Sequence, residues 1–148
     1  MRVRLLAALA LGLAVVLVYR LFIAPTGGYA QALAYTECPF RGEPRVTVSS
    51  NVVPPDTLPV RMHEQTHADQ CRTLGPWRYR WKNLTGSGRL SLESPAYCAG
   101  ARARLAQGDD PSLVRERVID DAEAAFKDIA QPASVRAALR ASCPEVFQ

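Results

Sequence analysis

The sequence predicts an α+β fold that is mainly α-helical and follows an N-terminal transmembrane helix. Three observations lead to this prediction: an unbroken apolar run near the start, one segment that alternates apolar and polar residues, and several later segments with apolar residues at helical spacing. A chain of 148 residues normally forms one domain. We therefore expect a short β-strand or hairpin, a helix that carries the motif HExxH, and two to three further helices.

The first element is a membrane anchor. Residues 5–18 are apolar without interruption behind two arginines, and the apolar run resumes after Arg20. With the Arg20 side chain reaching the interface, residues 5–24 provide the roughly 20 residues that span a bilayer. A small-x-small cleavage site occurs only around residues 30–34, which favours an uncleaved anchor in residues 1–24 over a signal peptide.

A linker and a strand come next. Residues 25–44 contain turn-forming pairs without a period and predict a linker to a domain at 45–148. The run RVTVSSNVV, residues 45–53, alternates valine with polar residues and predicts a strand or short hairpin that ends at Pro54. An extended substrate could pair with the edge of this strand.

Helices fill the rest of the chain. The first is expected over residues 57–74, with Gly75-Pro76 as its terminator, and the second over about 94–107. Residues 77–90, which include WRYRWK and Thr-Gly-Ser-Gly, are expected to form a connection. The third should begin after the cap Asp110 and reach about residue 130, with an apolar stripe of Val114, Val118, Ala122, Phe126 and Ile129. A short last helix follows Pro132.

The middle of the first helix carries the chemistry. His63 and His67, the two histidines of the chain, lie four residues apart, so both imidazoles can bind one metal ion from one helix face. Glu64 lies beside that face and could take a proton from an attacking water. The alternative is a helix with two histidines that bind nothing, because HExxH also occurs by chance.

A catalytic zinc needs a third protein ligand. Glu93 is the preferred candidate, because a loop after the first helix would let the next helix pack antiparallel and present this carboxylate. Cys71, one turn after His67, is the alternative, but its use would leave an odd number of cysteines.

These residues resemble a known family. HEQTH, Gln70, Leu74-Gly75, Tyr79 and Glu93-Ser-Pro-Ala-Tyr97 look like the small gluzincin (minigluzincin-like) metallopeptidases, over roughly residues 45–107. The resemblance implies Zn²⁺ on His63, His67 and Glu93, with Glu64 as general base for peptide hydrolysis. Within such a peptidase, Tyr79 or Tyr97 could polarise the scissile carbonyl, although packing is the preferred role for both. Pro95 suits the first turn of a helix, so we expect Glu93 at a helix start.

Cys38, Cys71, Cys98 and Cys143 all follow the apolar run and predict two disulfides in an oxidising compartment. A four-cysteine zinc site is the rival, but it lacks a CxxC pair. If the HExxH helix and the next helix pack antiparallel about the zinc, Cys71 and Cys98 are offset by roughly 13 Å, which disfavours that pair most. Of the other two pairings, we prefer Cys38 with Cys71 and Cys98 with Cys143.

Charge adds little. The net charge of +4 comes from dispersed arginines. The alternation in Trp77–Lys82 could stack bases, but no further basic cluster supports it, so we expect no nucleic-acid partner.

The sequence therefore predicts a monomeric, membrane-anchored zinc peptidase, extracytoplasmic (periplasmic or cell surface), that acts on a peptide or protein substrate. The alternative is a non-catalytic envelope interaction protein that keeps a structural zinc site.

Overall fold

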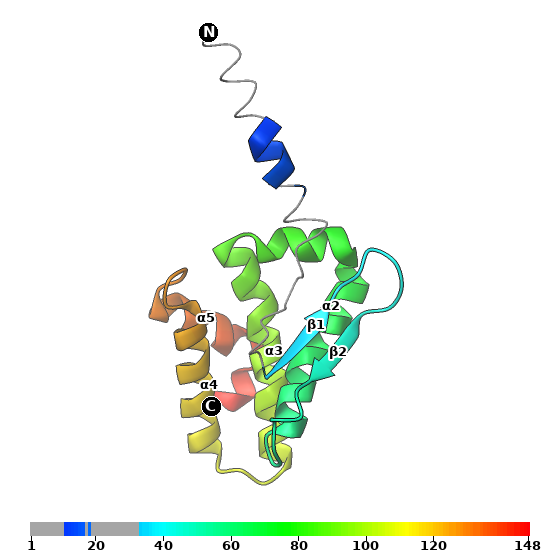
Figure 1. Cartoon of the computed structure of the whole chain (residues 1–148). Coiled ribbons are helices and arrows are strands. Elements are labelled where there is room, and N and C mark those ends of the chain that lie inside the picture. Colours follow the sequence, from blue (N-terminus) through cyan, green and yellow to red (C-terminus); the bar gives the residue numbers. More distant parts are fainter. Residues whose placement is uncertain (1–10, 17, 19–32) are drawn as a thin grey trace.

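The computed structural model describes residues 11–16, 18 and 33–148 (Figure 1). The chain is mainly helical with one small antiparallel sheet, which confirms the predicted class. Its elements are, in order, β1 (Ala34–Glu37), β2 (Arg45–Val48), α2 (Thr57–Asn83), α3 (Gly86–Ala106), α4 (Pro111–Phe126), α5 (Pro132–Ser142) and the 3₁₀ turn η2 (Pro144–Val146). In the part that the structure describes, no helix has the length and apolar character needed to cross a membrane. The predicted anchor, residues 5–24, lies largely outside that part.

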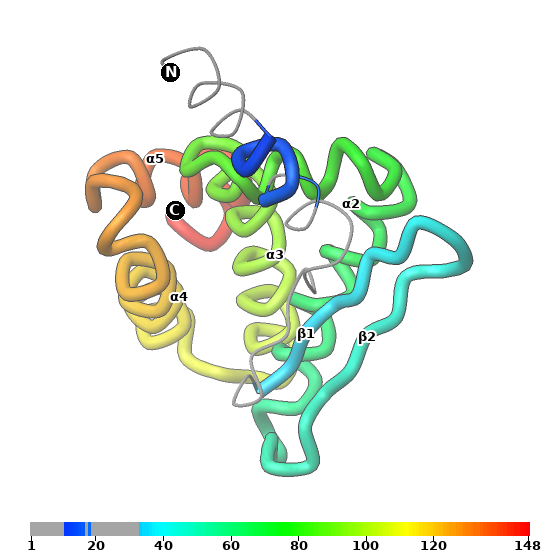
Figure 2. Tube along the Cα trace, turned by 45° about the horizontal axis from the view of Figure 1, so that its top comes forward, coloured from blue at the N-terminus to red at the C-terminus, as the bar shows by residue number. Residues whose placement is uncertain are grey.

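Helix α3 is the centre of the domain. It packs against α2 on one side and against α4 and α5 on the other, and the β1–β2 hairpin lies along α2 (Figures 1 and 2). One core fills the space between α3, α4, α5 and η2, and its largest buried side chains are Phe126, Leu139 and Val135. A second, smaller core joins the hairpin to α2 and α3 through Cys38, Cys71, Tyr79 and Leu92. The helix that carries HExxH is therefore held on two sides.

The hairpin contains a strand that the sequence did not reveal. Ala34 pairs with Val48 and Glu37 with Arg45 in an antiparallel ladder, so β1 lies inside the segment predicted as a linker. The predicted strand at 45–53 is shorter, because β2 ends at Val48. Four residues carry too little alternation to be recognised alone, and the pairing with β2 supplies the missing stabilisation.

The boundary between α2 and α3 also differs from the prediction. Gly75 has φ of 74° and kinks α2, but the helix resumes and continues to Asn83. Helix α3 begins at Gly86, so residues 77–90 are mostly helical and not a connection. A Cβ at Gly88 would lie 2.4 Å from the Lys82 oxygen. This glycine therefore permits a tight turn between two helices, where the sequence pattern indicated a loop.

Helices α4 and α5 begin where the sequence predicted, but α4 ends earlier than predicted. The Asp110 side chain accepts hydrogen bonds from the main-chain N–H groups of Ser112 and Leu113, as expected of an N-cap. The apolar stripe of α4 is buried as far as Phe126, where the helix ends. Ile129 lies beyond it and is 45% exposed, so it is not part of the stripe.

Two disulfides tie these layers together. Cys38 is bonded to Cys71, and Cys98 to Cys143, which is the pairing preferred from the sequence. The first joins the end of β1 to α2 one turn after His67. The second joins α3 to the end of α5. All four sulfur-bearing side chains are buried.

Candidate metal centre

Three side chains of types that can bind a metal meet between α2 and α3. His63 Nε2 lies 3.2 Å from His67 Nε2. Glu93 Oε2, from the facing helix, lies 3.3 Å from the first of these nitrogen atoms and 3.4 Å from the second. The helical spacing of four residues aligns the two imidazoles, and the packing of α3 on α2 brings the carboxylate to them.

These separations fit a tetrahedral metal. Zinc bonds to imidazole nitrogen and carboxylate oxygen at about 2.0 to 2.1 Å, so two ligand atoms of a tetrahedral site lie about 3.3 Å apart. The three observed separations, 3.2 to 3.4 Å, agree with this value. The two histidines and the glutamate would therefore hold a divalent ion, and this donor set accepts zinc as well as other first-row metals.

Close packing of the helices makes this convergence possible. Gly100 of α3 faces the first turn of α2, and a Cβ there would lie 3.2 Å from the Pro59 oxygen and 3.9 Å from the His63 Cβ. Glu93 lies in the interior of α3, seven residues before Gly100, and not at a helix start as predicted. The prediction failed because Pro95 is accommodated inside α3.

Gln70 fixes the orientation of His67. The side-chain Nε2 of Gln70 donates a hydrogen bond of 2.8 Å to the Leu92 oxygen, which can only accept. The amide oxygen of Gln70 therefore faces His67 Nδ1 at 3.0 Å and accepts a hydrogen bond from its N–H group. In the neutral imidazole, the form that can bind a metal, the lone pair of His67 is then on Nε2, which faces His63 and Glu93.

Glu93 and His67 each stabilise the charged form of the other. Burial alone would raise the pKa of Glu93, but the hydrogen bonds from His63 and His67 hold this pKa well below its usual range. Burial alone would lower the pKa of His67, but its hydrogen bond to Glu93 and the negative charge there outweigh burial and raise that pKa. Glu93 is thus ionised, as a metal ligand must be.

Glu64 is held beside the centre by a residue of β1. The Thr36 hydroxyl lies 2.8 Å from the Glu64 main-chain oxygen and 2.8 Å from its Oε2. Thr36 is buried, while Glu64 is half-buried and lines the cavity described below. Sequence reasoning missed this residue, because Thr36 belongs to no motif and its strand was not recognised.

A cavity of about 340 Å³ opens beside the histidine and the glutamate of the motif. Its lining includes His63, Glu64, Tyr97 and, from the hairpin, Leu33 and Ala34. The residues of the predicted strand edge, 46–52, do not line it. The cavity places a space for a ligand next to the metal-binding side chains.

The two tyrosines named from the sequence lie in different surroundings. The Tyr97 ring packs 4.9 Å from the His63 ring and lines the cavity. Burial and the negative charge of Glu93 raise the pKa of Tyr97, so its phenol is a neutral hydrogen-bond donor. Tyr79 is 4% exposed and packs against His67 without lining the cavity. Cys71, the alternative ligand, is bonded to Cys38.

Comparison with protein-family models, with curated proteins and with solved structures gave no match to this chain.

Proposed function

We propose that this chain is a zinc-dependent peptidase of the gluzincin type that hydrolyses peptide bonds with an activated water. The observation that carries the proposal is the convergence of His63, His67 and Glu93 at tetrahedral spacing beside Glu64. Two imidazoles and a carboxylate leave one of four positions for water or substrate, which is typical of catalytic sites. A purely structural site would normally use all four positions.

Hydrolysis needs a Lewis acid and a general base, and the proposed site would hold both. A zinc ion bound here would supply a Lewis acid that polarises the scissile carbonyl and lowers the pKa of water. Glu64, oriented by Thr36, accepts a proton from the attacking water and returns it to the leaving amine. Tyr97 can donate a hydrogen bond to the developing negative charge, because its phenol stays neutral.

The cavity indicates how a peptide would bind. Leu33 and Ala34 of the hairpin line it together with His63 and Glu64. A peptide in extended conformation could run beside β1 with its scissile bond over the metal centre. The relevant strand would then be β1, and not the 46–52 segment expected from the sequence.

The proposal includes a location. Residues 5–24 are apolar enough in sequence to anchor the chain in a membrane. Both disulfides lie after this run and are typical of an oxidising compartment. The peptidase would therefore act as a monomer on the extracytoplasmic side, in a periplasm or at a cell surface.

Hydrolysis of an unstructured protein by the full-length chain in detergent tests the proposal. The native chain should cleave it, a chelator should stop cleavage, and added zinc should restore it. The variant Glu64→Gln should bind zinc equally and lose activity by roughly 10² to 10⁴-fold. Zinc binding without hydrolysis by the native chain would instead support a non-catalytic envelope protein with a structural zinc.

A further inference from the structure

The second half of α2 exposes both tryptophans of the chain. Trp77 and Trp81 lie one turn apart after the kink at Gly75, and their exposed fractions are 47% and 53%. Together with Leu74, Arg78 and Lys82 they line a shallow hollow of about 580 Å³. These five residues are called the tryptophan face below. Exposed indoles of this size on a small domain indicate a surface that contacts something apolar.

The segment behind this face is fixed to the domain. Tyr79 and Arg80 are buried. The Arg80 guanidinium lies 4.7 Å from the centre of the Phe40 ring and donates a hydrogen bond to the Cys38 oxygen. The two buried residues point inward, so Trp77 before them and Trp81 after them are held outward on the same helix. Each face of this helical segment therefore carries both aromatic and basic residues, Tyr79 and Arg80 inward and the tryptophans with Arg78 outward.

The charge of the face is positive. Arg78 is exposed, and Lys82 reaches along the surface to the Ser91 hydroxyl at 3.2 Å. The sequence contains no acidic residue from Leu74 to Leu92. Tryptophan beside arginine and lysine is the composition of protein segments at the membrane interface, where indoles occupy the headgroup level and cations meet anionic lipid.

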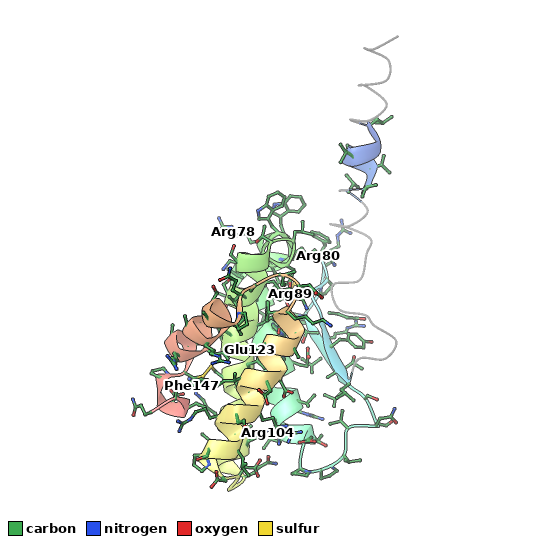
Figure 3. The ribbon with its side chains drawn as sticks, turned by 90° about the vertical axis from the view of Figure 1, so that its left-hand side faces the viewer. Arg78, Arg80, Arg89, Arg104, Glu123 and Phe147 are labelled. Carbon is green, nitrogen blue, oxygen red and sulfur yellow. A yellow bond between two sulfur atoms is a disulfide. The ribbon has the colours of Figure 1, made fainter. Side chains whose placement is uncertain are left out.

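The face lies at the end of the domain closest to the N-terminal segment. The described residues 11–16 project beyond the end that carries the second half of α2 (Figure 1), and Arg78 lies at that end while Arg104 lies at the opposite one (Figure 3). About ten residues connect residue 24 to β1, which can span at most about 36 Å. An anchor in residues 5–24 would therefore keep the whole domain close to the membrane surface.

Resting on the membrane anchor of the proposed function, we propose that the tryptophan face docks on the lipid surface of that membrane. The indoles insert at the headgroup level, and Arg78 and Lys82 bind anionic lipid headgroups. Because the anchor confines the domain near the bilayer, even a weak surface contact is sufficient to hold it. His67 lies eight residues before Gly75 on the same helix, which is about 12 Å along α2. Docking of the tryptophan face would therefore hold the candidate metal centre at a fixed place near the membrane.

Tryptophan fluorescence tests docking directly, because Trp77 and Trp81 are the chain's two tryptophans. Full-length protein is reconstituted in vesicles of phosphatidylcholine with phosphatidylglycerol, and alkaline carbonate extraction confirms insertion. Docked tryptophans should be quenched by lipids brominated near the carbonyl end of the acyl chain and protected from aqueous iodide. Full access to iodide without quenching by brominated lipid overturns the proposal. The readout does not depend on zinc or hydrolysis, so it separates this proposal from the proposed function.

A charge-reversal variant tests the role of the basic residues. Each basic side chain near an anionic surface contributes roughly fivefold to binding. Arg78→Glu with Lys82→Glu should therefore strongly reduce quenching by brominated lipid, while the matched control Arg61→Glu with Arg140→Glu should not. Both control residues are exposed and lie outside the tryptophan face. Equal quenching in the two variants would overturn the role of charge. A third outcome would also overturn docking on lipid. If protection from iodide grows with the protein-to-lipid ratio and brominated lipid does not quench, a second copy of the chain covers the face.

Discussion

The hydroxyl of Thr36, on β1, lies 2.8 Å from both the main-chain oxygen and the Oε2 atom of Glu64, on α2. One buried side chain thereby fixes the carboxylate proposed as general base and joins the hairpin to the HExxH helix. A hydroxyl that holds a base in position affects the rate of the chemical step more than substrate binding.

Replacement of this hydroxyl is the first prediction. Thr36→Val should lower kcat roughly ten- to a hundredfold with little change in KM, because Glu64 loses its orientation. Zinc content should stay at the native level, since Thr36 contacts none of the three proposed ligands. Thr36→Ser, which keeps the hydroxyl, should recover most of the rate. Steady-state kinetics with metal analysis decides, and an unchanged kcat in Thr36→Val would show that the contact is only structural.

The second prediction concerns the third ligand. Glu93→Ala should weaken zinc binding by roughly a hundredfold or more, because two histidines alone leave the ion without its third protein ligand. Glu64→Gln is the matched control and should retain about one zinc per chain. Elemental analysis of both purified variants provides the measurement. Full zinc retention in Glu93→Ala would remove this residue from the ligand set.

Gln70 gives a third prediction. The Gln70 amide oxygen accepts a hydrogen bond from His67 Nδ1, and the amide nitrogen donates one to the Leu92 oxygen. Gln70→Leu removes both bonds and should free the imidazole to rotate. Zinc affinity should fall roughly 10- to 100-fold, as it does when such outer contacts are lost. Competition with a chromophoric chelator measures it. Gln65→Leu, an exchange on the same helix outside this contact, should leave the affinity unchanged, and an equal loss in both variants would point to a general effect on α2.

The fourth prediction is a pH dependence of metal binding. Contact with Glu93 raises the pKa of His67 above its ordinary value of 6.5, and a proton on this imidazole excludes the metal. Zinc affinity should therefore be constant at high pH. As the solution is acidified, the affinity should start to fall before the pH reaches 6.5. Glu93, whose pKa is lowered, should not compete in this range. Affinity that stays flat from about pH 8 to 5 would contradict this assignment.

The disulfides give the fifth prediction. The two bonds close loops of similar length, with sequence separations of 33 and 45, so removal of either should reduce the free energy of unfolding by about 3 to 4 kcal/mol. Their effects on activity should differ. Cys38→Ser with Cys71→Ser loosens β1 and therefore Thr36, and should lower kcat more than Cys98→Ser with Cys143→Ser. Peptide mapping of the unreduced chain checks the pairing, and a bond between Cys71 and Cys98 would contradict it.

Several features followed from local sequence. The HExxH spacing placed both imidazoles on one face of α2, and Asp110 with Pro111 marked the start of α4, because helix periodicity and capping act over a few residues. The mainly helical class and the preferred cysteine pairing were also accessible at this level. For the cysteines, the regular rise of a helix disfavoured a bond between Cys71 and Cys98, once antiparallel packing of the two helices was assumed.

The tertiary structure decided what local patterns could not. Strand β1 exists because β2 pairs with it, and it alone brings Thr36 to Glu64. Gly88, which indicated a loop, instead permits the tight turn into α3, and Gly100, inside a predicted helix, permits close packing against α2. The distance between Glu93 and the histidines depends on how two helices pack, and the outward position of Trp77 and Trp81 depends on what covers Tyr79 and Arg80. Such relations join residues far apart in the chain, and only packing, which acts across the whole domain, determines them.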